Sequence, residues 1–482
     1  MACLIGAPTS GSGKTLLSLA LASLARQRGQ SIQTFKVGPD YLDPQLLGRV
    51  SGRSCRNLDL LLCGQEWVRR SFEGFGSRTD LCLVEGVMGL FDGRGPSSEA
   101  SSAAVALQLG LPVVLVVEAS RQAGSLAALV RGFRDHEPQL VLAGVVLNGV
   151  STPRHRALLA EALASIEMPL LGVLPRHESL SLPSRHLGLL PPHELLDLDG
   201  RIEEWAELAE RHLNLERLLP LMAAPPVPGP GTVDPIQSCL GAAQGQGRSA
   251  QPPVHVAIAA DAAFHFRYPE ASELLEAHGL AVRPWSPLAD EPLPADAGAL
   301  ILPGGYPELH AAALANSRRS LGDLARAAAR GLPIYAECGG LLLLGAHLED
   351  PGGVPHAMAG VLPFGARRGS LDLGYRQATP LADGLVVRRG EGLDGHEFHR
   401  WELVPPANAP PPIAPSPEPA TAPSPLWTLE GWGTPARREG WSAPGLHASW
   451  LHLHWAGCPE VPRRLAVAAR QHAAMATRPL IR

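Results

Sequence analysis

A glycine-rich loop close to the N-terminus restricts this chain to a small set of folds. The run 7–15 reads Ala-Pro-Thr-Ser-Gly-Ser-Gly-Lys-Thr, and it lies between an apolar segment at 2–6 and a helical pattern at 15–28. Such a loop cradles phosphates with its backbone N–H groups, and Pro8, which replaces the usual first glycine, makes it a variant P-loop. We therefore predict a doubly wound, mostly parallel sheet with its ligand at the carboxyl edge.

Each position of the loop suits a phosphate ligand. Gly11 and Gly13 allow close backbone approach, and Ser12 between them completes the cradle. Lys14 can reach the terminal phosphates of ATP, and the Thr15 hydroxyl can bind Mg²⁺ at the start of a helix. The alternative is an ordinary glycine-rich turn between a strand and a helix.

Lysine usage supports the same interpretation. The chain has 41 lysine and arginine residues, but only Lys14 and Lys36 are lysines. Arginine therefore supplies the general surface charge, and a retained lysine indicates a need for a compact ammonium against phosphate. We assign Lys36 to the nucleotide site with Lys14; the alternative for Lys36 is chance.

Acidic side chains follow two of the expected strands. Asp40 comes after the segment 31–37, and Glu85 and Asp92 come after the segment 80–84. Because the carboxyl ends of parallel strands meet at one edge of a sheet, we expect these carboxylates beside the phosphates. We predict that Asp40 and Glu85 bind Mg²⁺ and that Asp40 and Asp92 contact the substrate, with turn-capping as the alternative.

Two further polar residues near this edge have open roles. Asp43 precedes Pro44 and fits a ligand role and a capping role equally well. Asn148 ends the expected strand at 140–147, where it could form hydrogen bonds with the adenine base of ATP or simply form a turn.

The pattern of apolar segments predicts two α/β domains, at 1–222 and 254–482. The range 223–253 is rich in Pro, Gly, Gln and Ser and is interpreted as a linker, and 405–425 is interpreted as a disordered Pro-rich insertion. Further strands are expected at 112–117, 140–147, 254–259, 298–302 and 332–336, and helices at 120–135, 154–166, 269–277 and 321–330.

Composition narrows the possible partners. The formal net charge of −5 gives no electrostatic basis for binding nucleic acid or an anionic membrane, and no apolar run approaches the roughly 20 residues of a membrane span. The seven cysteines are scattered without metal-ligand spacing, which favours free thiols and the cytoplasm. A signal peptide is not expected, because its cleavage would damage the phosphate loop.

A second reactive centre is expected at Cys338. It lies between a buried strand at 332–336 and an apolar helix, and Gly339 and Gly340 permit a sharp turn between the two. Such a turn would expose the sulfur at a helix N-terminus, where the helix dipole favours thiolate. The amide of Gly339 could form half of an oxyanion hole, and the turn at 302–308 could supply the second amide, at Gly305 or Tyr306. The alternative is a buried, inert cysteine.

A thiol nucleophile needs a base, and histidines gather in two segments. His452 and His454 are expected on one face of a strand, a spacing that also suits a metal pair, although no third ligand is evident. The second segment, 395–399, contains two more histidines, and its alternative interpretation is an ordinary polar loop. Together the two centres suggest that ATP activates one substrate while a cysteine releases a second reactant.

Taken together, these motifs resemble the CbiA/CobB family of corrinoid amidotransferases, the cobyrinic acid a,c-diamide synthases. The resemblance covers most of the chain apart from the linker and the Pro-rich insertion. The matching segments are 35–44, 56–59, 85–93, 261–264, 304–308, 337–340, 395–399 and 451–454. It implies an N-terminal domain similar to dethiobiotin synthetase and a C-terminal class I glutamine amidotransferase domain, both α/β.

The resemblance also implies an activity. Members of this family amidate the a and c acetate groups of cobyrinate with L-glutamine, ATP and Mg²⁺, and ammonia passes between the two centres. By position, Leu42 joins Asp40, Glu85 and Asp92 in the synthetase site, Cys338 is the nucleophile and His452 is its base. The implied partners are small molecules, and a homodimer is left open.

Some alternatives stay open at this point. His454 stands where many class I amidotransferases have a Glu that orients the catalytic His, so we expect a dyad. That departure also disfavours a CTP synthetase, while Thr9 disfavours a partitioning-type ATPase switch, which has a signature lysine there. The segment 38–41 disfavours the sister cobyric acid synthases. Hydrogenobyrinate or a metal sirohydrochlorin could replace cobyrinate.

Overall fold

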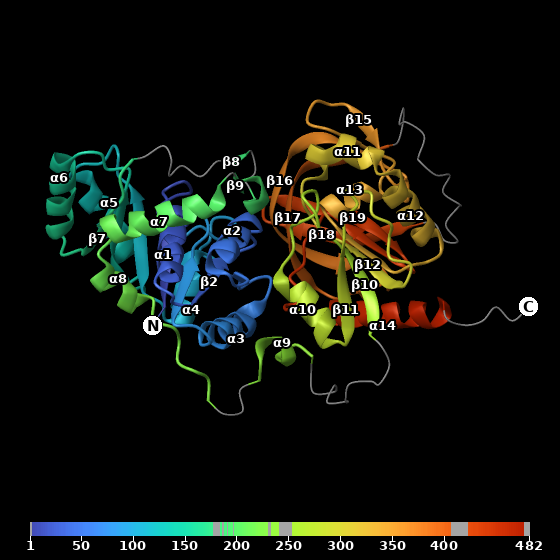
Figure 1. Cartoon of the computed structure of the whole chain (residues 1–482), viewed down its shortest axis with the longest axis horizontal. Helices are drawn as coiled ribbons and strands as arrows, with labels where there is room; N and C mark the ends of the chain where they lie inside the picture. Colours follow the sequence, from blue (N-terminus) through green and yellow to red (C-terminus); the bar gives the residue numbers. More distant parts are fainter. Residues whose placement is uncertain are drawn as a thin grey trace, which may run out of the picture. The chain divides into compact units, whose positions relative to one another are not determined.

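The computed structural model divides into two compact units, Met1–Pro235 and Ile236–Arg482 (Figure 1). It describes residues 2–176, 184–185, 188–189, 191–195, 197–229, 233–240, 253–405 and 423–476. The division between the units falls within the range 223–253, and the short helix α9 (Pro235–Ser238) lies at that point.

A parallel sheet forms the centre of the N-terminal unit. Among the described residues it has seven strands in the order β3-β2-β4-β1-β5-β6-β7, all paired in parallel. The strands are β1 (Cys3–Gly6), β2 (Ile32–Val37), β3 (Arg56–Leu58), β4 (Leu81–Glu85), β5 (Val113–Glu118), β6 (Leu142–Asn148) and β7 (Leu170–Val173), with a separate pair β8 (Ser184–Arg185) and β9 (Gly188–Leu189). The chain changes its direction of travel across the sheet beside β1, where open α/β sheets form their ligand crevice.

Helices surround this sheet. They are α1 (Lys14–Gln27), α2 (Leu42–Ser51), α3 (Gly64–Gly76), α4 (Ser102–Leu109), α5 (Ser125–His136), α6 (Pro153–Ala164), the 3₁₀ helix η2 (Pro192–Glu194), α7 (Leu198–His212) and α8 (Leu215–Leu221). Helix α1 is buried along most of its length, because α7 and α2 pack against it and its residues join the apolar core. Trp205 of α7 is completely buried in this core. The packing fixes the helix that begins directly after the phosphate loop.

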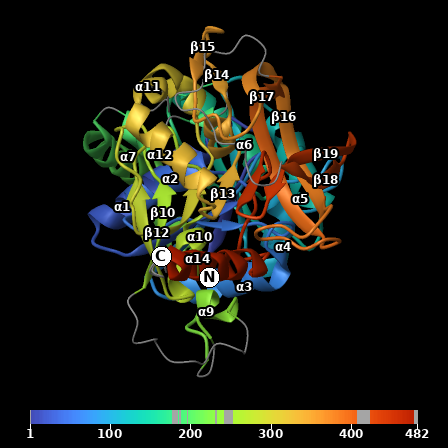
Figure 2. The ribbon, with the colours of Figure 1, turned by 90° about the vertical axis from the view of Figure 1, so that its right-hand side faces the viewer.

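The C-terminal unit has a mixed sheet of eleven strands among the described residues. Its order is β11-β10-β12-β13-β20-β19-β18-β16-β14-β15, and β17 pairs with β16. The strands are β10 (Val254–Ala259), β11 (Leu280–Trp285), β12 (Ala297–Leu302), β13 (Ile334–Glu337), β14 (His347–Glu349), β15 (Pro355–Ala357), β16 (Gly365–Pro380), β17 (Leu393–Val404), β18 (Ser424–Gly431), β19 (Thr434–Ala443) and β20 (Leu446–Ser449). The part from β11 to β20 is parallel, and the long antiparallel ribbon of β16 and β17 is seen in Figure 2.

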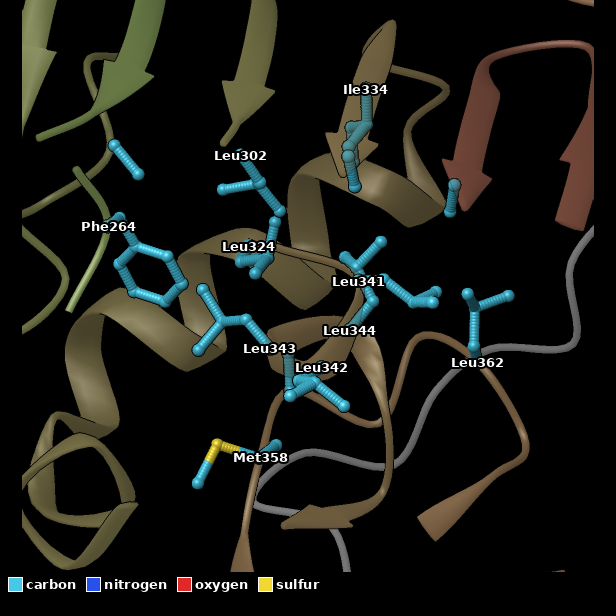
Figure 3. Packing of buried hydrophobic residues seen from close by; sticks show 14 of the residues in the cluster. Phe264, Leu302, Leu324, Ile334, Leu341, Leu342, Leu343, Leu344, Met358 and Leu362 are labelled. Atoms are coloured by element: carbon cyan, nitrogen blue, oxygen red, sulfur yellow. The ribbon is translucent and has the colours of Figure 1, made fainter. Parts of the chain in front are cut away.

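The helices of this unit are α10 (Pro269–Ala277), η3 (Pro307–His310), α11 (Ala311–Asn316), α12 (Arg318–Ala329), α13 (Gly339–Leu344) and α14 (Glu460–Ala476). Helix α13 is buried on all sides, which explains its run of four leucines, 341–344. Figure 3 shows these leucines among Phe264, Leu302, Leu324 and Met358. Among the described helices, none combines the length and apolar character that a membrane span requires.

Most predicted elements of the parallel regions are present, with small shifts at their ends. The helix expected at 120–135 begins only at Ser125, after a turn. The prediction that His452 and His454 lie on a strand is wrong. This segment is irregular apart from a single β-bridge between His452 and His396. Residues 406–422 of the expected insertion lie outside the described residues, and its last two residues begin β18.

Replacing Trp205 with Ala tests the packing between α7 and α1. Removing a completely buried indole leaves a cavity, and we expect a loss of about 3–5 kcal/mol in the free energy of unfolding of the N-terminal unit. Urea denaturation, followed by amide hydrogen exchange in α1, measures this loss. The exposed neighbour Glu204 provides the control, because Glu204→Ala should change stability by less than about 0.5 kcal/mol. Equal effects of the two substitutions would contradict the described packing.

Candidate functional site

The phosphate loop runs from the end of β1 to the start of α1. Gly11 and Gly13 have positive φ angles of 79° and 108°. A Cβ atom on Gly13 would lie 2.5 Å from the side-chain nitrogen of Asn148, which donates a hydrogen bond to the Ser12 carbonyl at 3.1 Å. Position 13 therefore needs glycine, and Asn148 fastens the loop to the end of β6.

Lys14 is tied to the loop that follows β4. Its Nζ donates to the Met88 carbonyl at 2.6 Å, and Met88 has a positive φ of 47°, which is unusual for a non-glycine residue. Burial, reinforced by the charge of Lys36, lowers the pKa of Lys14 to about 8. Lys14 therefore carries its charge at neutral pH and loses it as the pH rises through about 8.

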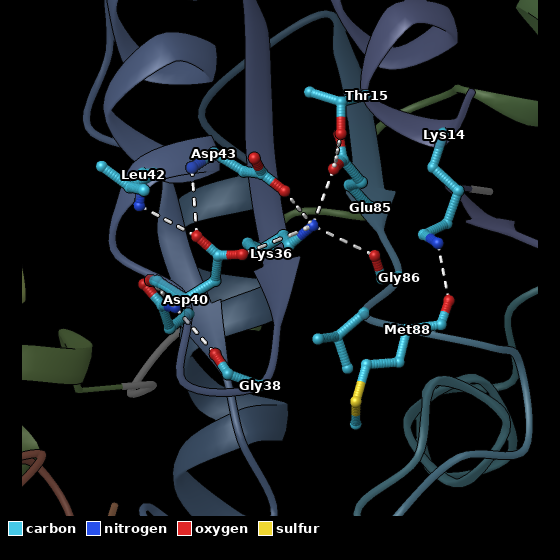
Figure 4. A network of polar contacts seen from close by, with 12 residues as sticks. Lys14, Thr15, Lys36, Gly38, Asp40, Leu42, Asp43, Glu85, Gly86 and Met88 are labelled. Carbon is cyan, nitrogen blue, oxygen red and sulfur yellow. Dashed lines mark hydrogen bonds and ion pairs between the residues drawn. The ribbon is translucent and has the colours of Figure 1, made fainter. Parts of the chain in front are cut away.

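Lys36 is the centre of a buried network that links three segments (Figure 4). Its Nζ lies 2.5 Å from Asp43 Oδ2, 2.7 Å from Glu85 Oε1 and 3.1 Å from the Gly86 carbonyl. Thr15 Oγ1 donates to the same Glu85 oxygen at 2.8 Å. The structure therefore brings together Thr15, Lys36 and Glu85, which lie far apart in the sequence.

The charges of this network depend on one another. Burial alone would lower the pKa of Lys36, but Asp43, Glu85 and Asp40 outweigh it and raise this pKa well above its ordinary value. Burial raises the pKa of Glu85 even though Lys36 opposes the shift. Burial and the charge of Asp43 likewise raise the pKa of Asp40. The ammonium of Lys36 is thus permanently charged and balances more than one carboxylate.

Asp40 shapes the loop between β2 and α2. Its Oδ1 accepts hydrogen bonds from the backbone amides of Leu42 at 2.9 Å and Asp43 at 3.1 Å. The side-chain amide of Asn57 donates to the carbonyls of Gly38 and Asp40, both at 2.8 Å. The Leu42 amide is therefore engaged and its side chain is buried, so the substrate contact of Leu42 stays a prediction.

Asp92 shapes the loop after β4 in a similar way. Its Oδ2 accepts the Gly89 amide at 2.8 Å. A Cβ on Gly89 would lie 2.6 Å from that oxygen and 2.7 Å from the Pro8 carbonyl, so this turn packs directly against the phosphate loop. Asp40 and Asp92 both act as capping carboxylates here, and their roles toward metal or substrate stay predictions.

The oxygen atoms around Glu85 fit a magnesium ion. Thr15 Oγ1 and Glu85 Oε1 are neighbouring hard donors, and Glu85 Oε2 is buried and accepts no hydrogen bond from the described residues. The hydroxyl of Ser18 beside it donates instead to the Lys14 carbonyl at 3.0 Å. Among the described residues no cluster of three His, Cys, Asp or Glu side chains could hold a metal. Mg²⁺ commonly uses one or two protein ligands together with phosphate oxygens and water, and the Thr15 and Glu85 oxygens supply two such ligands.

In the C-terminal unit, Cys338 forms a strained elbow between β13 and α13. Its φ of 47° and ψ of −109° are unusual for a residue with a side chain. A Cβ on Gly340 would overlap the Leu302 carbonyl, and one on Gly339 would lie 2.9 Å from the Gly305 nitrogen. A Cβ on Gly305 would overlap the Ala263 carbonyl. The structure therefore places Cys338 and Gly339 against the turn that contains Gly305.

The prediction that the Cys338 thiolate is exposed is wrong in this structure. Cys338 is only 4% exposed, and its Sγ lies 3.7 Å from the Phe398 carbonyl, to which it donates. Burial raises the pKa of this thiol, and the charges of Glu308 and Glu337 raise it further. The short helix α13 does not offset these effects, so the thiol needs a base to remove its proton.

His452 lies against the same turn. It is 1% exposed, and a Cβ on Gly304 would lie 2.5 Å from its Cε1 atom. Its Nδ1 lies 3.5 Å from Glu337 Oε2, and its backbone exchanges hydrogen bonds of 2.9 and 3.0 Å with His396.

His454 has a separate environment. Its ring packs on Tyr268 with centroids 4.2 Å apart, and its Nε2 lies 3.6 Å from Glu270. Neither histidine belongs to a group of three His, Cys, Asp or Glu side chains that could hold a metal within the part of the chain that the structure describes.

The segment 395–399 is part of the buried strand β17, not a polar loop. Glu397 is fully buried, and its oxygens lie 2.6 Å from Arg376 Nε, 2.5 Å from Arg437 Nη2 and 3.5 Å from His399 Nε2. Burial alone would raise the pKa of Glu397, but these three groups hold it down to about 2. The cluster fixes the strand whose Phe398 carbonyl meets the thiol.

Two carboxylates near Cys338 are not among the residues that the sequence motifs predicted for this site. Glu308 in η3 is 7% exposed, and burial raises its pKa to about 7. Glu337 directly precedes Cys338 and is 8% exposed. For Glu337 the sequence did contain a signal. It is a glutamate at the end of an otherwise apolar strand, where a buried charge needs a specific partner.

Comparisons with known proteins agree with this division of the chain. Residues 3–190 match the CbiA family, described as the CobQ/CobB/MinD/ParA nucleotide binding domain. Residues 255–457 match the GATase_3 family, described as the CobB/CobQ-like glutamine amidotransferase domain. The predicted α/β fold of both parts is confirmed.

Three relatives match almost over their whole length. A cobyrinate a,c-diamide synthase of Gloeobacter violaceus is 41% identical, covering 94% of this chain and 94% of the relative. The enzyme of the same name from Synechococcus sp. is 39% identical, covering 98% and 100%. A hydrogenobyrinate a,c-diamide synthase of Streptomyces coelicolor is 40% identical, covering 97% of each. The chain belongs to the family of a,c-diamide synthases, which join a CbiA-type nucleotide-binding domain to a CobB/CobQ-like glutamine amidotransferase domain.

Proposed function

We propose that this enzyme is a carbon–nitrogen ligase that amidates the a and c acetate groups of cobyrinate, with glutamine as nitrogen donor and ATP as energy source. The product is cobyrinate a,c-diamide, an intermediate of cobalamin biosynthesis. One observation carries the proposal: a phosphate loop and a thiol elbow occur in one chain, and relatives of this chain are named cobyrinate a,c-diamide synthase. We further place the enzyme in the cytoplasm, because its seven cysteines, all among the described residues, form no disulfide bond.

The N-terminal unit would activate the substrate carboxylate. A carboxylate is a poor electrophile, and its phosphorylation by ATP turns it into an acyl phosphate. The amides of the loop at 11–13 and the Lys14 ammonium would hold the phosphates, and Asn148 keeps this loop in place. Thr15, Glu85 and Asp40 would hold Mg²⁺, which neutralises phosphate charge when bound.

The C-terminal unit would release ammonia from glutamine. His452 would remove the proton of Cys338, and the sulfur would attack the carboxamide carbon. The amides of Gly305 and Gly339 would stabilise the oxyanion, and the Gly305 amide donates to no other described residue. Ammonia leaves with the proton from His452, and water then hydrolyses the thioester to glutamate. The ammonia attacks the acyl phosphate, which yields the amide and inorganic phosphate.

Hydrogenobyrinate is a second candidate substrate. A relative named for that substrate has 40% identity over 97% of the chain, close to the values for the relatives named for cobyrinate. The two substrates differ in the presence of cobalt, and the sequence identities to the two groups of relatives are nearly the same.

The first test is direct conversion. The purified protein, with glutamine, ATP and Mg²⁺, should replace two carboxylates of cobyrinate by amides in succession, as followed by mass spectrometry. Hydrogenobyrinate is tested in parallel, and the higher kcat/KM identifies the natural substrate. Failure to amidate either compound, with ATP hydrolysis intact, would reject the proposal.

Cys338→Ala separates the two half-reactions. Without the sulfur, glutamine cannot form a thioester, so glutamine-dependent amidation should fall at least about 1000-fold. Amidation with ammonium chloride should stay within about threefold of the unmodified enzyme, because the N-terminal site is unchanged. Cys458→Ala, which removes another thiol of the same unit, is the control and should keep both activities. Normal use of glutamine by the Cys338→Ala enzyme would exclude Cys338 as the nucleophile.

Lys14 gives ATP binding a pH dependence. Its pKa of about 8 means that the ammonium loses its proton as the pH rises through 8. The affinity for ATP should therefore fall about tenfold between pH 7 and pH 9, since about a tenth of Lys14 stays charged one unit above its pKa. Calorimetric titration measures this change. Lys14→Arg, charged throughout the range, should show weaker binding without the pH dependence. A flat profile for the unmodified enzyme would contradict this role.

A further inference from the structure

The position that carries an orienting glutamate in many class I amidotransferases is His454 in this chain. That residue cannot take over the role, because its ring packs on Tyr268 and lies 3.6 Å from Glu270. Glu397 is held by Arg376 and Arg437. The group that orients His452 must therefore be sought elsewhere in the C-terminal unit.

Glu337 lies at the required place. Its Oε2 is 3.5 Å from His452 Nδ1, and both residues are buried, His452 at 1% exposed and Glu337 at 8%. A carboxylate at this distance attracts an N–H group and stabilises an imidazolium, and such contacts are often long before substrate binds. The contact therefore places a carboxylate oxygen next to Nδ1, as in the outer pair of a catalytic triad, at a distance longer than a hydrogen bond.

The two oxygens of Glu337 have different tasks. Oε1 accepts hydrogen bonds from the Leu453 amide at 3.1 Å and from the Tyr335 hydroxyl. These two donors fix the rotamer of the carboxylate and attach it to the segment that carries His452. Oε2 is consequently directed toward the imidazole.

The position of Glu337 in the chain couples it to the nucleophile. It is the last residue of β13 and is joined by one peptide bond to Cys338, whose amide donates to the Ser449 carbonyl at 2.7 Å. The strand β20, which includes Ser449, pairs in parallel with β13 and leads into His452. One strand end thus sets the positions of the thiol and of the carboxylate.

We propose that Glu337 is the positioning residue of the glutaminase centre, in place of the missing triad glutamate. Its Oε2 accepts a hydrogen bond from the Nδ1–H of His452, which leaves Nε2 unprotonated and able to take the proton of Cys338. The carboxylate then stabilises the resulting imidazolium until the proton passes to the departing ammonia. This inference rests on the proposed roles of Cys338 and His452.

Glu337→Gln tests the inference, because the substitution can keep one oxygen and change the other. The amide oxygen of Gln can still accept from Leu453 and Tyr335, while its NH₂ group faces Nδ1 as a donor. His452 is then held in the opposite tautomer, with Nε2 protonated. We expect kcat for glutamine hydrolysis to fall about 100- to 10,000-fold, with KM changed less than about threefold.

Glu439→Gln is the matched control. Glu439 is another buried glutamate of the same unit, and it accepts hydrogen bonds from Trp427, Ser449 and the Trp450 amide. Its replacement should lower the thermal midpoint, because an amide NH₂ meets a donor, but should keep kcat for glutamine hydrolysis within about fivefold. Loss of kcat in Glu337→Gln without a comparable loss of thermal stability supports a positioning role.

Two results would overturn the inference. One is a Glu337→Gln enzyme with glutaminase kcat within about threefold of the unmodified protein. The other is a parallel loss of stability and activity in both variants, which indicates a structural role. Amidation from ammonium chloride is measured in each case and should persist in Glu337→Gln. If Cys338→Ala still used glutamine, the proposed function would fail, which is a different outcome from failure of Glu337 alone.

Discussion

Close approach between backbone segments without intervening Cβ atoms is the constraint on which both reaction centres depend. In the N-terminal unit, Gly13 lets the phosphate loop lie against Asn148. In the C-terminal unit, Gly340 lets the elbow pack on the Leu302 carbonyl, and Gly305 lies on the Ala263 carbonyl. In each unit a buried parallel strand ends at such a contact and a helix begins there. Rigid strands thereby position reactive groups on short loops.

Buried charge is the second shared feature, and each unit compensates it differently. One ammonium, Lys36, balances Asp43 and Glu85 beneath the phosphate loop. One carboxylate, Glu397, is balanced by two guanidinium groups beside the thiol. Removing one partner from such a cluster leaves an uncompensated buried charge, which commonly costs about 3–5 kcal/mol. These clusters therefore order the loops at both sites besides any part they take in chemistry.

The parallel regions and both glycine-rich turns could be predicted because apolar runs and glycines are local signals. The antiparallel strands β16 to β19 could not, since their many polar residues, such as Arg367 and Arg368, give no continuous apolar pattern. The burial of Cys338 also escaped prediction, because it depends on Phe398, sixty residues away. Likewise His452 and His454 were expected on one strand face, but tertiary contacts with His396 and Tyr268 separate them.

The raised pKa of Cys338 makes the orientation of His452 more consequential than it is in enzymes with a preformed thiolate. A thiol that keeps its proton reacts only when a base removes it during attack. Glu308 and Glu337 both raise the pKa of Cys338, the proposed nucleophile, and Glu337 also lies 3.5 Å from Nδ1 of His452, the proposed base. In the proposed mechanism Glu337 therefore opposes spontaneous ionisation of the thiol and faces the imidazole that would take its proton.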